Sequence, residues 1–101
     1  MANTIITTNR TIEISNIDSD YMMDIGINVE SVIFLPGAEN NSVDIVEERD
    51  GGANPLKVRL ISGDGEPRVW YTNQRLRLGF VFADGVFAAT AVVIFNIGSL
   101  V

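Results

Sequence analysis

The stretch from Leu76 to Ile97 constrains the fold of this chain most, because it is rich in Val, Ile, Phe and Ala and contains an Asp84-Gly85 pair. An Asp-Gly pair between apolar residues is a strong signal for a β-hairpin, since Gly accepts a positive φ freely and Asp tolerates it. The pattern therefore predicts one strand from Leu76 to Phe82 and a second strand that follows the turn and runs up to Ile97.

The second of these strands is apolar on both of its faces. Side chains alternate between the two faces of a strand. One face would carry Phe87, Ala89, Ala91, Val93, Phe95 and Ile97, and the other Ala88, Thr90, Val92 and Ile94. A strand of this kind needs cover on both sides. A second sheet of the same chain can supply one cover, and we expect another copy of the protein to supply the other.

The rest of the chain also has the pattern of short strands separated by turn residues. Residues 4–8 and 11–15 are expected to form one strand or two short ones. The other expected strands are 21–28, 29–35, 43–48, 56–61, 68–72 and the two around Asp84-Gly85, with a turn at Asn73-Gln74. Turn signals at this spacing are typical of a β-sandwich or a small barrel. We predict an all-β fold of about eight strands, a jelly-roll-like antiparallel β-sandwich that forms a single domain over residues 1–101.

Composition excludes several other classes of protein. Hydrophobic residues make up 47% of the chain and charged residues 20%, which is unlike an intrinsically disordered segment. Residues 78–101 contain one charge, but a Gly, an Asp-Gly pair and an Asn divide them into runs shorter than the roughly 20 residues of a membrane-spanning helix. The chain has no Cys, so its stability must come from packing and oligomerisation.

The charge is negative and unevenly distributed. The net charge is −6, which argues against a nucleic-acid ligand, because phosphates require clustered Lys and Arg. Residues 1–50 hold ten of the thirteen acids, whereas residues 57–77 hold five of the seven bases. Two interpretations remain open: oppositely charged strands lie side by side or face solvent, or an acidic face on one copy meets a basic face on the next.

Little in the sequence indicates catalysis or a cofactor. The chain has no His and no Cys, so it lacks the side chains of Ser-His and Cys-His catalysis and of most zinc sites. Paired carboxylates could in principle hydrolyse glycosides, and Asp18, Asp20 and Asp24 could approach a calcium ion, although the spacing is not that of an EF-hand. We expect no enzymatic activity, no metal and no cofactor.

The candidate functional residues are therefore contact residues. Trp70 and Tyr71 are adjacent, so on a strand they point to opposite faces, and we expect Trp70 to pack in the core while the exposed ring stacks on a sugar or anchors a protein contact. The Gly-rich loop 49–55 is a candidate contact point. The expected interface consists of Ala89, Ala91, Val92, Val93, Ile94 and Phe95 on the last strand, with Arg49 and Asn54 from the loop.

Several segments resemble small structural proteins encoded among the virion genes of tailed bacteriophages. These segments are Val29-Glu-Ser-Val-Ile-Phe-Leu-Pro-Gly37, Val43-Asp-Ile-Val-Glu-Glu48, Arg68-Val-Trp-Tyr71 and Leu76-Arg-Leu78. The resemblance implies a non-enzymatic β-sandwich that decorates the capsid or forms part of the neck or tail. It also implies a symmetric oligomer. We expect the partners to be other copies of the chain, in a trimer, and virion proteins such as a major capsid protein, with no nucleic acid and no membrane. The protein would reside in the virion, and in the host cytoplasm before assembly.

A carbohydrate-binding β-sandwich is the alternative function. It would use Trp70, Tyr71 or Tyr21 on a flat exposed strand.

Overall fold

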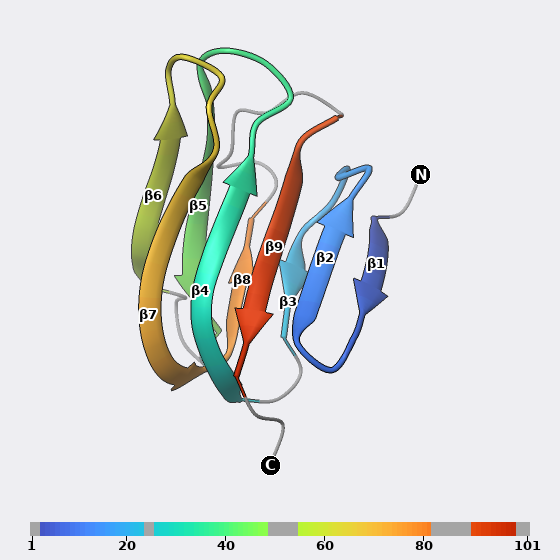
Figure 1. Ribbon diagram of the computed structural model, residues 1–101, viewed down its shortest axis with the longest axis vertical. Helices are drawn as coiled ribbons and strands as arrows, with labels where there is room; N and C mark the ends of the chain where they lie inside the picture. The colour runs from blue at the N-terminus through green and yellow to red at the C-terminus, as the bar shows by residue number, and fades with distance from the viewer. Residues whose placement is uncertain (1–2, 24–25, 49–54, 82–89, 99–101) are drawn as a thin grey trace.

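The computed structural model describes residues 3–23, 26–48, 55–81 and 90–98, and all regular structure within these ranges is β-strand. The strands are β1 (Thr4–Thr7), β2 (Thr11–Ser15), β3 (Tyr21–Met22), β4 (Ile27–Leu35), β5 (Asn41–Glu47), β6 (Leu56–Ser62), β7 (Arg68–Leu76), β8 (Leu78–Phe80) and β9 (Val92–Ile97). They form two antiparallel sheets, and in Figure 1 the five-stranded sheet lies in front of the four-stranded one.

The strand order identifies the fold as a jelly roll. The five-stranded sheet has the order β1-β2-β9-β4-β7 and the four-stranded sheet the order β3-β8-β5-β6. Strands pair in a nested way, β5 with β6, β4 with β7, β3 with β8 and β2 with β9, so the chain is one long antiparallel ribbon that is wrapped into two sheets. This is the double-sheet arrangement of jelly rolls. The prediction of a jelly-roll-like β-sandwich is confirmed, with nine strands in the described residues.

The core lies between the sheets and follows the alternation of the strands. Phe34, Phe80 and Phe95 are its largest fully buried side chains. The half-buried ring of Tyr21 packs against Phe80 and Phe95, at centroid distances of 6.1 and 5.8 Å. Each fully buried large apolar side chain contributes about 1.5–3 kcal/mol, so these residues and the Ile and Val side chains around them hold the two sheets together.

The predicted strand 21–28 is wrong as one element. Tyr21 and Met22 form β3 in the four-stranded sheet, whereas Ile27 begins β4 in the five-stranded sheet. The chain therefore passes from one sheet to the other between Met22 and Ile27. Alternation of apolar and polar residues continues through this passage, and that is why periodicity did not separate the two strands.

The predicted hairpin across Asp84-Gly85 is also wrong in its pairing. Strands β8 and β9 lie in different sheets: β8 pairs with β3 and β5, and β9 pairs with β2 and β4. The Asp84-Gly85 pair itself lies outside the described residues. A turn signal acts over a few residues, whereas the choice of sheet depends on burial against distant strands.

Oppositely charged residues pair within the chain where β5 and β6 lie side by side. Arg59 Nε and a terminal nitrogen of Arg59 donate to the two carboxylate oxygens of Asp44, at 2.6 and 2.9 Å. Lys57 and Glu47 approach to 3.9 Å on the same pair of strands. Of the two interpretations of the uneven charge, the pairing of neighbouring strands is confirmed for these residues.

Candidate functional site

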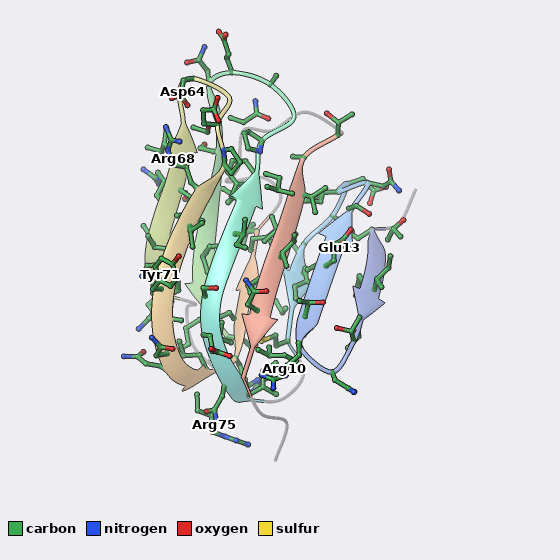
Figure 2. All side chains as sticks on the ribbon, viewed as in Figure 1. Arg10, Glu13, Asp64, Arg68, Tyr71 and Arg75 are labelled. Atoms are coloured by element: carbon green, nitrogen blue, oxygen red, sulfur yellow. The ribbon has the colours of Figure 1, made fainter. Side chains whose placement is uncertain are left out.

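The candidate functional site is the outer face of the five-stranded sheet, which faces the viewer in Figures 1 and 2. Strand β9 lies between β2 and β4 in this sheet. Val93, Phe95 and Ile97 point into the core and are at most 1% exposed, while Val92 and Ile94 point outward and are half-buried. The strand is thus apolar on both faces, as the sequence predicts, and the second sheet covers one of them.

Apolar side chains from four strands gather on this outer face. Residues that are paired between neighbouring strands form one row across the sheet. From β1 to β7, the row is Ile6, Glu13, Ile94, Ile33 and Val69. Val92 and Leu35 form a neighbouring pair. We call Ile6, Ile33, Leu35, Val69, Val92 and Ile94 the apolar patch.

The patch is open to solvent at its sides. Ile6 is 52% exposed and Val69 42% exposed, and the other four members are half-buried. Glu13 is the one charged residue in the row that crosses all five strands (Figure 2). Contiguous apolar surface of this kind marks an interaction site more often than scattered apolar residues do.

The interface residues that the sequence suggested lie in different environments, some in the core and some on the outer face. Ala91, Val93 and Phe95 are 0% exposed in the chain's own core, so they cannot contact another copy while the fold is intact. Val92 and Ile94 lie in the apolar patch. Ala89, Arg49 and Asn54 lie outside the described residues. Sequence reasoning missed Ile33 and Val69, because their contribution depends on which strands flank β9.

Below the apolar patch, the same face contains a polar hollow of about 380 Å³. We call it the Tyr71 hollow. It is lined by Arg10, Glu30, Ser31, Tyr71, Asn73, Asn96 and Ile97. The labelled side chains of Arg10 and Tyr71 in Figure 2 locate it on the lower part of the face, between the β1–β2 turn and β7. The hollow thus combines one aromatic ring with side chains from four strands or turns that are distant in sequence.

Two irregularities in the strands form the hollow. On β4, Val29 pairs with Ile97 and Ser31 with Asn96, so Glu30 is an extra residue in that ladder. On β7, Asn73 has a φ of 50°. Bulges bend a strand and redirect its side chains, and this one turns Glu30 and Ser31 to the same hollow. The predicted turn at Asn73-Gln74 is wrong, since β7 continues through both residues to Leu76.

Hydrogen bonds hold the floor and rim of the hollow. Asn96 Nδ2 donates to Ser31 Oγ at 3.0 Å, and Ser31 is only 6% exposed. The backbone N–H of Ile97 donates to the carbonyl oxygen of Arg10 at 2.7 Å, which ties the β1–β2 turn to the end of β9. The polar side chains are therefore held on a backbone that is fixed by the sheet.

Trp70 and Tyr71 lie as the sequence predicts, whereas Tyr21 does not lie on an exposed strand face. Trp70 is half-buried and packs against the core, whereas Tyr71 is 76% exposed on the outer face. Tyr21 packs between the sheets against Phe80 and Phe95, so its ring is not on an open strand face. Of the three aromatic residues considered for a sugar, only Tyr71 is largely exposed.

The described residues contain no group of three or more acidic side chains that could hold a metal ion, and Asp24 of the suggested calcium loop lies outside them. Within the described ranges there is no helical segment with the length and hydrophobicity that a membrane crossing requires.

No protein-family model and no curated protein sequence matches this chain. By its structure, the protein is a jelly-roll β-sandwich. One of its sheets has an outer face that is apolar in one part and polar in another.

Proposed function

We propose that this protein is a non-enzymatic structural component of a bacteriophage virion, such as a capsid decoration protein, which assembles into homo-oligomers through the apolar patch. The observation that carries the proposal is the second apolar face of β9. Val92 and Ile94 lie at the centre of a sheet, yet no described strand covers them from outside. A second copy would supply that cover.

The size and shape of the face fit this role. Strands lie about 4.8 Å apart, so five strands make a face roughly 20 Å wide. A stable contact buries about 800 Å² on each partner, and a sheet face of this width can supply part of it. Self-association normally gives closed symmetric oligomers. We propose a trimer, in which the patch of each copy meets a different surface of the next copy; a patch that met itself would give a two-fold dimer.

Two further arguments support a virion component. Jelly rolls are common in viral capsid and lectin domains, and the segments around Val29–Gly37 and Arg68–Tyr71 resemble small virion proteins of tailed bacteriophages. The partners would be other copies of the chain and virion proteins such as a major capsid protein. The resemblance concerns strand order and turn placement, so it carries no catalytic residue to this chain.

Sedimentation velocity of the full chain at micromolar concentration tests the assembly. We expect an oligomer that dissociates to monomer in the variant Ile94→Glu, because the variant places a charge at the centre of the contact. Ile61→Glu is the matched control: Ile61 is 57% exposed on β6 of the other sheet. It should sediment as the unchanged protein does.

A wild-type chain that stays monomeric from dilute to concentrated solution would refute the assembly. Circular dichroism of each variant separates loss of the oligomer from loss of the fold. The virion role has its own test in the neighbouring genes. Portal, terminase or tail genes beside this one support the proposal, and a metabolic operon contradicts it.

A further inference from the structure

From the geometry and chemistry of the Tyr71 hollow, we infer that it is a binding site for an uncharged saccharide of one or two rings. The inference goes beyond the proposed function, since it concerns a different part of the sheet face. The apolar patch and the hollow occupy successive rows along the strands, about 7 Å apart. The hollow stays open when the copy on the patch covers the rows on the far side of the patch, because a contact that took up the whole face would cover the hollow as well.

The lining of the hollow has the mixed chemistry that a sugar requires. An exposed Tyr ring offers an apolar plate to the C–H groups of a pyranose. Asn73 and Asn96 each carry an amide that both donates and accepts hydrogen bonds. The guanidinium of Arg10 and the carboxylate of Glu30 can each contact two neighbouring hydroxyl groups.

The charges favour a neutral ligand. Arg10 and Glu30 carry opposite formal charges, so the charges of the lining cancel. An anion would meet the carboxylate of Glu30 and a protein of net charge −6. A metal ion would find a single carboxylate, although hard cations require several oxygen ligands. A lipid chain would find six polar or charged side chains among the seven residues of the lining.

The position of the hollow argues against an extended peptide. Peptides that add to a sheet bind at an exposed strand edge, where backbone groups are unpaired. Strand β7, which carries Tyr71 and Asn73, is the edge strand of the sheet, but the hollow extends from β7 inward over the face of β4 and β9 and not along the free edge of β7. Its volume of about 380 Å³ lies at the small end of the range for ligand sites, which fits one or two sugar rings.

The site is also preorganised. The bond from Asn96 to Ser31 orients the Asn96 amide along the floor. The positive φ of Asn73 holds that residue on a bulge rather than in the regular ladder, and bulges occur frequently at functional sites. A ligand would therefore meet one amide that is already oriented and a backbone that is fixed by the sheet, which lowers part of the entropic cost of binding.

An array of neutral mono- and oligosaccharides, probed with the full chain, tests the inference. Isothermal titration with the best-binding sugar should then show at least tenfold weaker binding for Tyr71→Ala and for Asn96→Ala. Tyr71→Phe should retain most of the affinity, because the stacking ring remains. Gln74→Ala is the matched control: Gln74 is exposed on the same strand but does not line the hollow.

Binding to a neutral ligand should change little between about 0.05 and 0.5 M salt. The inference fails if no neutral sugar binds, if both alanine variants bind as the wild type does while remaining folded, or if only charged sugars bind in a salt-dependent way. It also fails for the assembled protein if the monomeric Ile94→Glu variant binds sugar and the wild type does not. That result would place the hollow inside the contact between copies.

Discussion

Gly79 is the position where a single methyl group should affect the fold most directly. Strands β8 and β3 are paired so closely at Gly79 and Met22 that a Cβ at Gly79 would collide with the carbonyl oxygen of Tyr21 and lie 2.8 Å from the Cα of Met22. Both atoms belong to the backbone, which cannot move aside without breaking the pairing of β3 with β8. We therefore expect Gly79→Ala to displace β3.

The size of the effect follows from what β3 contributes. Overpacking costs about 1–3 kcal/mol. Displacement of β3 also removes the packing of Tyr21 against Phe80 and Phe95, at about 0.5–1.5 kcal/mol for each aromatic pair. The free energy of unfolding should fall by about 2–6 kcal/mol in total.

Urea unfolding followed by circular dichroism measures this change, with Gly63→Ala as the matched control. A Cβ at Gly63 has no atom within 4 Å, and the φ of Gly63 is not positive. This variant should be neutral or more stable by up to about 1 kcal/mol, because alanine restricts the unfolded chain. Equal free energies of unfolding for the two variants would refute the reasoning, since they would mean that β3 and β8 do not approach so closely.

Two further predictions concern the charged residues. Arg59→Met should lower the free energy of unfolding by about 1–2 kcal/mol, because it removes the bidentate partner of the Asp44 carboxylate, and Asp44 is only 6% exposed. Lys57→Met is the control and should change the free energy of unfolding by less than about 0.5 kcal/mol. Equal losses for the two variants in urea unfolding would contradict a stabilising role of the Arg59–Asp44 pair. The pKa of Asp64 is lowered from 3.8, mainly because the backbone N–H of Glu66 donates to its carboxylate. The ionised carboxylate thus stabilises the turn above pH 3.8, and this contribution is lost as the pH falls through the lowered pKa of Asp64. NMR titration of the Asp64 carboxyl signal measures this pKa. Titration at 3.8 would count against the hydrogen bond.

The last strand shows how much of the fold can be predicted from the sequence. Alternation alone places Ala91, Val93, Phe95 and Ile97 on one face, and the structure confirms this. It could not determine which face is inward, because Val92 and Ile94 are equally apolar. The tertiary structure determines the inward face, because β9 lies between β2 and β4 and turns one face toward the second sheet.

The Tyr71 hollow could not be predicted from the sequence, for a different reason. Its residues come from segments around positions 10, 30, 72 and 96, and no local motif connects them. The one available signal was the pair Asn73-Gln74, which has turn chemistry inside a strand pattern. The pair predicts a turn, but Asn73 lies in a bulge, because Tyr71 pairs with Ser31 and Gln74 pairs with Val29 on either side of it.

The sequence by itself determined that the chain is all-β, which residues alternate along each strand, that a strand ends at Leu35, and that His and Cys chemistry is absent. The tertiary structure decided which strands are neighbours, which apolar face is left outward, and where the polar hollow forms. Alternation and turn chemistry depend on a few adjacent residues, whereas strand pairing depends on burial between residues far apart in the chain. The same local pattern is therefore compatible with several sheets, and only the packed molecule selects one of them.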